Sequence, residues 1–313
     1  MRPVINHIIN NTVEMETIMN INDIKCVGFI GLGLIGGCIA RRLKQTYPSM
    51  EIIAYDYSYS KKGKHSIGLV LAKSDTTIDG ISTNIQDFSR CDLIFLCAPV
   101  TNNMNYLSQL KVIIKDDCIV TDVGSVKGCM HKKALELGME WNFVGGHPMA
   151  GSEKTGYENS FSSLLEKAYY VITKTNNSDP EKVEIIYNIA NHLKAIPLIL
   201  EPKLHDDSVS AISHVPHIMA FCLANLVKES DNEDQIMKSI AAGGFKDTTR
   251  IASSSPYMWQ SIMETNKESI LNTLDNYINK LTEFRNDIAN DSKDKIIESI
   301  SNARDYRDTY SKF

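Results

Sequence analysis

The stretch that decides the fold runs from Lys25 to Gln45 and reads KCVGFIGLGLIGGCIARRLKQ. A short apolar segment comes first, three glycines spaced as GxGxxG follow, and the remainder has the composition of a helix. A strand that turns through such glycines into a helix is the usual opening of a βαβ unit that binds a nucleotide. The order of these three parts therefore predicts an α/β domain built on that unit.

The three glycines, Gly31, Gly33 and Gly36, each have a separate physical task. The first permits a tight turn, the second lets the backbone approach a pyrophosphate, and the third lets the helix pack on the strand. A diphosphate would then lie at the amino end of the helix, beside Leu34 and Ile35. In this context we interpret the motif as a dinucleotide site rather than a chance glycine turn.

The second predicted strand ends in an acid, Asp56, which lies 20 residues after Gly36. A carboxylate there can accept hydrogen bonds from the ribose hydroxyls and would repel a 2′-phosphate, so NAD is favoured over NADP. The alternative is an aspartate that merely ends a strand in a turn. Three nearby basic residues could also neutralise a phosphate: Lys61, Lys62 and Lys64.

The apolar segments that follow predict a sheet. After a strand over 51–56, further strands are predicted at 92–98, 118–122, 143–144, 169–174 and 196–200, with helical stretches between most of them. Strands that alternate with helices form a mainly parallel sheet covered on both faces. We therefore expect a Rossmann-like domain over 24–203, preceded by an N-terminal tail over 1–23.

The strand pattern stops beyond Leu204, and the remaining sequence is helical. Long helical segments are predicted at 205–228, 232–243 and 256–312. The C-terminal helices are long enough to need an extended partner surface, which indicates a homodimer. The predicted fold class is an α/β Rossmann-type domain with a mainly parallel sheet, followed by an all-α substrate and dimerisation domain over 204–313.

The composition limits the kinds of partner. The chain has 313 residues, 43% of them hydrophobic and 23% charged, with a formal net charge of -5, which argues against a nucleic-acid partner. No uninterrupted apolar run has the roughly 18 to 20 residues that cross a bilayer, and the N-terminus does not fit a signal peptide. Seven cysteines without a CxxC pair are typical of reduced thiols. We expect a soluble, cytoplasmic protein with no membrane partner.

Two residues near predicted strands have the chemistry of a hydride-transfer site. His147 lies on a glycine-flanked loop, where an imidazole can act as acid and base. Ser125 follows the strand over 118–122, and its hydroxyl can hold a substrate hydroxyl beside a nicotinamide. Ala98 and Pro99 end another strand, where such folds bind ligands. The alternatives are a structural histidine at 147 and a helix cap at Ser125.

The helical half offers further polar residues. At about 100° per residue, the helix over 209–223 carries apolar residues on one arc and, on the opposite arc, Ser210, Ser213, His214 and His217. Pro216 should kink this helix. The two histidines find no third ligand in the sequence, which argues against a metal site. Arg250 offers a charged fork for a carboxylate, or is an exposed helix arginine. Glu153 is a candidate for substrate binding or a surface carboxylate.

Five motifs follow one another along the chain: GLGLIGG at 31–37, DVGSVKG at 122–128, GHPMAGSE at 146–153, SHVPH at 213–217 and GFKDTTR at 244–250. In this order they resemble the prephenate/arogenate dehydrogenase family of tyrosine biosynthesis. Each glycine motif alone is generic, but the combination is specific to that family. The resemblance covers roughly residues 24–285.

The resemblance implies an NAD-dependent oxidative decarboxylation of prephenate to 4-hydroxyphenylpyruvate, with arogenate as the alternative substrate. NAD takes hydride from the carbon that bears the 4-hydroxyl, carbon dioxide leaves, and the ring becomes aromatic. His147 matches the family histidine that accepts the hydroxyl proton. Ser125 matches the serine that places hydroxyl and nicotinamide. Arg250 matches the arginine that binds a substrate carboxylate, and the supporting substrate residues are Ser213, His217 and Trp259.

The resemblance also implies a homodimer joined through the helical domains. We expect neither an appended regulatory domain nor a fused chorismate mutase, so tyrosine inhibition would act at the active site by product mimicry. A rival interpretation is a β-hydroxyacid dehydrogenase, which shares the two-domain plan but normally uses a lysine of the helical domain, whereas His147 lies in the Rossmann half. A catalytically idle NAD-sensing protein would have no need of His147, Ser125 and Arg250 together.

Overall fold

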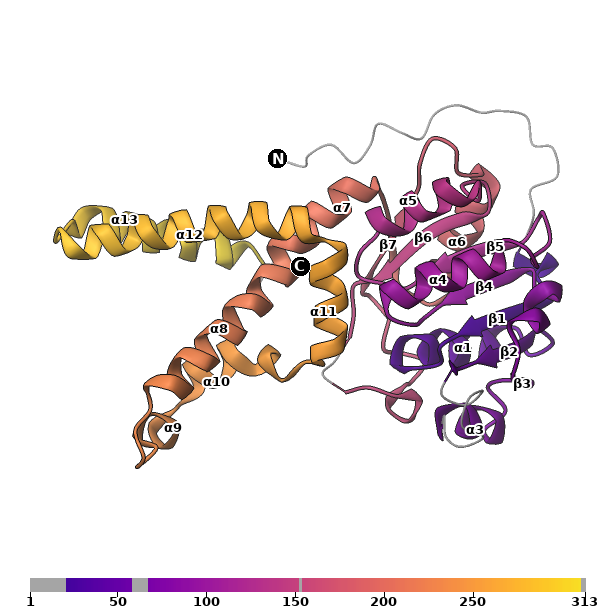
Figure 1. Cartoon of the computed structure of the whole chain (residues 1–313), viewed down its shortest axis with the longest axis horizontal. Coiled ribbons are helices and arrows are strands. Elements are labelled where there is room, and N and C mark those ends of the chain that lie inside the picture. Colours follow the sequence, from indigo (N-terminus) through magenta and orange to yellow (C-terminus); the bar gives the residue numbers. More distant parts are fainter. Residues whose placement is uncertain (1–20, 58–66, 152–153, 311–313) are drawn as a thin grey trace. The chain divides into compact units, whose positions relative to one another are not determined.

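The computed structural model of the protein describes residues 21–57, 67–151 and 154–310. The chain divides into two compact units, Met1–Pro202 and Lys203–Phe313 (Figure 1). Of the predicted N-terminal tail, the described part is the turn of 3-10 helix at Ile21–Asp23, in which Ile21 is buried.

The first unit contains an eight-stranded sheet with the order β3-β2-β1-β4-β5-β6-β7-β8. The strands are β1 (Cys26–Ile30), β2 (Glu51–Tyr55), β3 (Gly80–Ser82), β4 (Leu93–Leu96), β5 (Ile119–Asp122), β6 (Phe143–Pro148), β7 (Tyr169–Thr173) and β8 (Ile196–Leu200). Neighbouring strands are parallel except for β6 and β7. The predicted mainly parallel sheet is confirmed, and its strand order reverses between β1 and β4, the position at which such sheets bind ligands.

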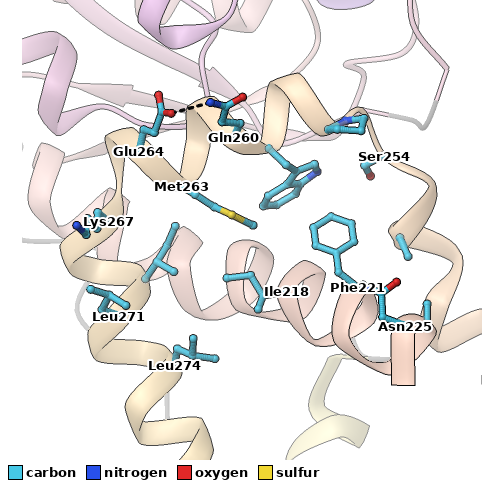
Figure 2. Close-up of a pocket in the computed structure, with 15 residues that line it drawn as sticks. Ile218, Phe221, Asn225, Ser254, Gln260, Met263, Glu264, Lys267, Leu271 and Leu274 are labelled. Carbon is cyan, nitrogen blue, oxygen red and sulfur yellow. Dashed lines mark hydrogen bonds between the residues drawn. The ribbon is translucent and has the colours of Figure 1, made fainter. Parts of the chain in front are cut away.

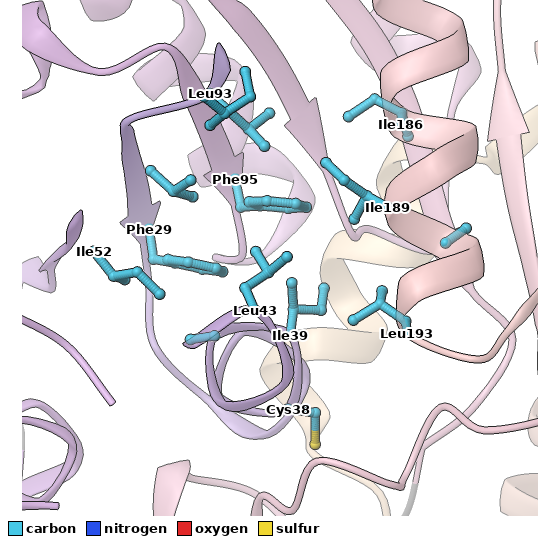
Figure 3. Close-up of a cluster of buried hydrophobic side chains, with 14 of the residues drawn as sticks. Phe29, Cys38, Ile39, Leu43, Ile52, Leu93, Phe95, Ile186, Ile189 and Leu193 are labelled. Carbon is cyan, nitrogen blue, oxygen red and sulfur yellow. The ribbon is translucent and has the colours of Figure 1, made fainter. Parts of the chain in front are cut away.

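Helices of the first unit cover both faces of the sheet (Figure 1). They are α1 (Leu34–Thr46), α3 (Ile67–Ser74), α4 (Val100–Leu110), α5 (Gly128–Leu137) and α6 (Pro180–His192). In the core, the rings of Phe29 and Phe95 stack with centroids 5.0 Å apart. Leu43 of α1 and Ile189 of α6 pack in the same buried cluster (Figure 3), so α1 and α6 lie on one face of the sheet. Burial of these apolar side chains holds β1 and β4 beside the glycine turn.

Two strands differ from the sequence-based prediction. The pattern did not predict β3, because its three residues include a glycine and a serine and are too few to show an alternation. The strand β6 continues to Pro148 rather than ending at Val144, since Gly145 and its successors pair with β7 in antiparallel register. His147 therefore lies in a strand and not on a loop, and pairing with β7 overrides the loop-like composition.

The second unit is helical, as predicted. Its helices are α7 (Pro202–Val209), α8 (Val215–Ser230), α9 (Ile236–Ile240), α10 (Gly243–Thr249), α11 (Pro256–Thr265), α12 (Lys267–Ala289) and α13 (Lys293–Thr309). The segment predicted as one long helix over 256–312 is three helices, which break at Asn266 and at Asn290–Ser292. Asp291 there has a φ of +52°. The helices α12 and α13 run side by side (Figure 1).

A turn of π-helix at Ser210–His214 separates α7 from α8 and corrects the predicted helix faces. Pro216 has no amide hydrogen, so regular helical bonding cannot continue through it. The extra residue in the wide turn rotates the chain that follows relative to a 3.6-residue period. As a result Ser210 and His214 are buried, whereas Ile212, placed on the buried arc by the sequence pattern, is 63% exposed.

The continuous helical segment Pro202–Ser230 is long and apolar enough, by length and composition alone, to cross a membrane. Within its most apolar window 28% of the residues are buried in the isolated chain. The same segment carries His214, buried within the unit, and the half-buried His217. Polar groups of this kind are costly to place in the hydrocarbon of a membrane. This favours the interpretation that the apolar surface of the segment packs on protein.

Candidate active site

The glycine turn after β1 has the geometry that the motif requires. Gly31 has a φ of +84°, and a Cβ atom there would lie 3.0 Å from the backbone nitrogen of Ala98. Only glycine adopts this conformation without strain and allows this approach. The Gly31 amide donates a hydrogen bond of 2.8 Å to the carbonyl oxygen of Tyr55, which ties the turn to the end of β2. Asp56, the predicted ribose ligand, is the next residue.

The next glycine of the motif faces open space. Apart from its neighbours in the chain, no described residue has an atom within 4 Å of the position that a Cβ of Gly33 would occupy. Gly33 is also the N-cap residue of the helix α1 and offers no side chain to cap it. The backbone amides of Leu34 and Ile35 form the positive end of that helix. Gly36, by contrast, is packed, because its Cβ would lie 3.0 Å from the carbonyl oxygen of Gly31. An open glycine beside helix amides fits the diphosphate of a dinucleotide.

A buried asparagine fixes the turn that follows β4. The Asn103 side chain donates to the carbonyl oxygen of Leu96 at 3.2 Å and accepts from the amide of Ala98 at 3.1 Å. Pro99 then precedes the first turn of α4. Asn103 was not singled out from the sequence, where its only signal is an amide side chain in the first turn of a helix after a strand.

A fully buried ion pair lies at the carboxyl end of β5. The Lys127 ammonium contacts the Asp122 carboxylate, and both side chains are 0% exposed. The same carboxylate accepts the amide of Gly124 at 3.0 Å and that of Gly146 at 3.2 Å, and Lys127 Nζ donates to the carbonyl oxygen of Gly146 at 2.7 Å. Burial raises the pKa of the Asp122 carboxyl, while Lys127 and the two amides oppose that rise.

The predicted catalytic residues flank this pair. Ser125 is half-buried in the loop between β5 and α5, and His147 is half-buried in β6, opposite Val171 of β7. The N-cap residue of α5 is Lys127, so Ser125 is not the helix cap considered as its alternative. Because β1, β4, β5 and β6 are parallel, Ser125 and His147 lie at the same edge of the sheet as Gly31.

The second unit gathers four of the predicted substrate residues. The Nδ1 atom of His217 donates to the carbonyl oxygen of Ser213 at 2.8 Å, because a carbonyl can only accept. The His217 ring stacks on Trp259 with centroids 4.0 Å apart. Burial lowers the pKa of His217, and the positive charge of Arg250 lowers it further. Arg250 itself is exposed. The fifth predicted residue, Glu153, lies outside the described residues, as do Lys61, Lys62 and Lys64.

The histidines considered as metal ligands have other partners. His217 is engaged with Ser213, and His214 Nδ1 lies 3.2 Å from the side-chain nitrogen of Asn266. Within the described ranges no group of three or more histidine, cysteine or acidic side chains could hold a metal ion.

An apolar groove of about 820 Å³ lies between α8, α11 and α12 of the second unit. Figure 2 shows Ile218 and Phe221 of α8 facing Met263 of α11, with Leu271 of α12 at one end. Trp259 lines the groove, and its buried indole nitrogen has no hydrogen-bond partner in the described part of the chain. Such a lining suits apolar side chains of a protein surface better than a charged metabolite.

Comparison with known proteins agrees with this architecture. Models of the prephenate dehydrogenase nucleotide-binding domain and dimerization domain match residues 39–198 and 201–302. The prephenate dehydrogenase of Bacillus subtilis (strain 168) is 35% identical over 281 residues, which cover 89% of this chain and 74% of that protein.

Solved structures agree as well. The crystal structure of A. aeolicus prephenate dehydrogenase in complex with hydroxyphenyl propionate and NAD+ has a TM-score of 0.84 and 29% identity, covering 90% of this chain and 97% of that one. Synechocystis arogenate dehydrogenase has a TM-score of 0.77 and 26% identity, covering 91% and 99%. With both domain models matched in sequence and the same two-unit fold, this chain belongs to the prephenate dehydrogenase family.

Proposed function

We propose that this protein catalyses the NAD-dependent oxidative decarboxylation of prephenate to 4-hydroxyphenylpyruvate, a step of tyrosine biosynthesis. The observation that carries the proposal is the placement of His147 in β6, at the same sheet edge as the glycine turn and bound through Gly146 to the buried pair beside Ser125. Membership of the family and the printed activity of the B. subtilis relative support it.

The first unit provides the groups that would hold NAD. Gly31 makes the tight turn, Gly33 leaves room for the diphosphate, and the amides of Leu34 and Ile35 face negative charge favourably. Asp56 would accept the ribose hydroxyls and repel a 2′-phosphate, so we propose NAD rather than NADP. When bound there, NAD supplies an acceptor for the hydride of the carbon that bears the 4-hydroxyl.

His147 is proposed as the acid and base of the reaction. It accepts the proton of the 4-hydroxyl as the carbonyl forms, and returns it to the same oxygen after carbon dioxide leaves and the ring becomes aromatic. Ser125 holds the hydroxyl in place by a hydrogen bond. Aromatisation supplies driving force, so alignment and one base are the main demands on the protein.

The helical unit is proposed to bind the substrate carboxylates. Arg250 carries a permanent positive charge and a planar fork of N–H donors, which suits a carboxylate. Ser213 and His217 support it, and Trp259 holds the His217 ring in place by stacking. Arogenate is the second candidate substrate, because a relative of the same fold is an arogenate dehydrogenase. Its ammonium group would need an acidic partner, a role that the sequence offers to Glu153.

We further propose a cytoplasmic homodimer joined through the helical units. The matched dimerization domain and the apolar groove support the dimer, and seven free thiols support the cytoplasm. Tyrosine inhibition would be competitive with prephenate, because the product analogue would occupy the same site.

The test is to measure NADH formation with prephenate, arogenate and a 3-hydroxyacid in parallel, together with release of carbon dioxide. We expect prephenate to give one NADH and one carbon dioxide per molecule consumed. Turnover of the 3-hydroxyacid with no reaction of prephenate would establish the β-hydroxyacid dehydrogenase alternative instead. NAD binding without turnover of any substrate would establish the idle NAD-sensing alternative.

A further inference from the structure

The pairing of β6 with β5 ends before β6 reaches His147, although β6 stays paired with β7 on its other side. The strands β5 and β6 pair at two positions, Thr121 with Val144 being the last. Beyond that position, two side chains replace the β5 backbone as hydrogen-bond partners of β6. The Gly146 amide donates to Asp122 Oδ1, and the Gly146 carbonyl oxygen accepts from Lys127 Nζ. The buried pair thus supplies one acceptor and one donor, as a paired strand would.

The same pair anchors the loop that carries Ser125. Asp122 Oδ2 accepts the Gly124 amide at 3.0 Å, and Ser125 lies in the chain between Asp122 and Lys127. Both ends of this short loop are therefore tied to the residue that precedes His147.

Close approach of the two strands is built into the sequence. A Cβ on Gly146 would lie 2.6 Å from the backbone oxygen of Asp122, whereas a Cβ on Gly145 would meet Thr173 of β7 first. A larger residue at position 146 would push β6 away from β5 and out of reach of the pair. Glycine at this position therefore serves the bridge.

A buried ion pair is a poor choice if stability alone is needed. Removing two charges from water is costly, and apolar residues of the same volume often stabilise a core as well or better. The directional bonds of Asp122 and Lys127 to Gly124 and Gly146 provide something that an apolar pair cannot, a fixed distance between two backbone segments.

We propose that Asp122 and Lys127 are positioning residues that set the spacing of Ser125 and His147. The proposal rests on the proposed function, because it takes those two residues as catalytic. Neither Asp122 nor Lys127 needs to contact substrate or cofactor for this role. They act through the backbone of Gly146 and Gly124.

The test compares the double variant Asp122→Asn/Lys127→Gln with the variant Lys182→Gln. The double variant removes both charges and nearly keeps the volume. Lys182 of α6 is a matched control, because it is also a buried lysine, at 3% exposure. Its Nζ atom donates a hydrogen bond to the carbonyl oxygen of Asp116 and not to β6. Readouts are kcat, the Kd of NAD, the melting temperature, and hydrogen exchange of the 143–148 peptide.

We expect the double variant to lose at least about tenfold in kcat, since small displacements of catalytic groups have effects of this size. Its exchange over 143–148 should be faster and its Kd for NAD within about twofold of wild type. The control should lose melting temperature without a change in kcat or in that exchange. A double variant with wild-type kcat and wild-type exchange, whatever its melting temperature, overturns the positioning role.

These readouts distinguish failure of the proposed function from failure of the positioning role. If the wild type turns over none of the substrates, the proposed function fails, while exchange over 143–148 still decides whether the pair holds β6. If the double variant does not fold, Asp122→Asn alone takes its place, because asparagine keeps the size and an acceptor. Faster exchange in Asp122→Asn supports the role, and unchanged exchange contradicts it.

Discussion

In the proposed substrate site, a neutral imidazole beside a permanent cation would divide the binding of substrate between two residues, His217 and Arg250. The Nδ1 hydrogen of His217 is committed to the carbonyl oxygen of Ser213, so the neutral ring presents Nε2 as an acceptor. Burial lowers the pKa of His217 and the nearby charge of Arg250 lowers it again, so His217 is neutral at pH 7. In that proposed site, the positive charge for a substrate carboxylate would therefore come from Arg250.

Replacing Arg250 by alanine should weaken substrate binding more than it slows the chemical step. Loss of a charge-assisted hydrogen bond of about 1.5 to 3 kcal/mol predicts a KM for prephenate about 10- to 100-fold higher, with kcat little changed. Steady-state rates at saturating NAD measure both. Arg304→Ala on α13 is the control, because Arg304 is exposed and bonds Asp305. A lower kcat at unchanged KM would assign Arg250 to the transition state instead.

The sequence was enough to identify residues whose type is dictated by the local backbone conformation. It was not enough to identify residues whose hydrogen-bond partners are recognised only in the folded chain. Gly31 was recognisable because a tight turn after a strand requires glycine. Asp122 and Lys127 lie in a quoted motif, yet their pairing with Gly146 exists only once the fold places β6 beside β5. Asn103 was missed for the same reason, since its partners become visible only in the turn that it closes.

At the scale of elements, two glycines in the turn before α1 have different roles. Gly31 is required by the conformation of the turn, and Gly33 leaves space for the ligand. Gly31→Ala should destabilise the protein without NAD, because a left-handed residue costs about 1 to 2 kcal/mol and its Cβ meets the backbone. Gly33→Ala should cost less than about 1 kcal/mol in the free protein, because its Cβ enters open space. It should raise the Kd of NAD about tenfold or more, a loss of about 1.4 kcal/mol.

Urea unfolding without NAD and NAD titration by calorimetry separate these two effects. The account of the turn is wrong if Gly33→Ala binds NAD as the wild type does, or if Gly31→Ala is as stable as Gly33→Ala.

The π-helical turn shows where periodicity misleads. A regular period of 3.6 residues placed His214 on a face open to a cleft, whereas the wide turn before Pro216 buries it against Trp259, with ring centroids 5.9 Å apart. One extra residue in a helix turn has no marked signature in hydrophobicity. The helical nature of the segment was thus predictable, and the direction of its side chains was not.

Burial of His214 makes the stability of the helical unit depend on pH. Its pKa is lowered by burial from 6.5 to about 4, so the folded protein binds this proton less readily than the unfolded chain. The contribution to stability is present above pH 6.5 and is lost as the pH falls from 6.5 towards 4, by about 3 kcal/mol in total.

The variant His214→Gln should lack this part of the pH dependence. Urea unfolding at one protein concentration, followed by the fluorescence of buried Trp259, gives the free energy of unfolding at pH 7 and pH 4.5. The wild type should lose about 2 to 3 kcal/mol more than the variant between these pH values. Equal losses would mean that His214 titrates normally in the folded protein.

At the scale of the molecule, the helical unit has more apolar surface than an isolated chain should leave open. Large apolar side chains exposed there include Leu226, Ile240, Leu271, Leu281 and Ile297. Leu271 is 47% exposed and lines the groove between α8, α11 and α12. Where exposed apolar side chains meet in a patch, they often mark an interface with another protein surface.

If the proposed dimer uses this groove, a charge placed in the groove should separate it. Leu271→Glu is expected to halve the mass measured by light scattering at micromolar concentration, because an unpaired carboxylate in an apolar interface costs several kcal/mol. Leu135→Glu is the control, since Leu135 is 58% exposed on α5 of the first unit. Wild-type mass for Leu271→Glu, or equal dissociation of both variants, would remove the groove from the interface.

The overall architecture was the part most open to prediction. Alternation of strands and helices up to residue 200 and its loss thereafter indicated a parallel sheet followed by a helical unit, and the family match agrees. The antiparallel pairing of β6 with β7 was not predictable, because no local pattern records which strands become neighbours. That pairing is also what turns the expected loop around His147 into a strand.

The most direct measurement of the central claim is the turnover of prephenate by wild type and His147→Asn at saturating NAD. If His147 removes the hydroxyl proton, the variant should bind NAD with unchanged Kd and lose about 10²- to 10⁴-fold in kcat, the usual contribution of a general base. A kcat within a few fold of wild type would contradict the claim, because the proton would then leave by another route.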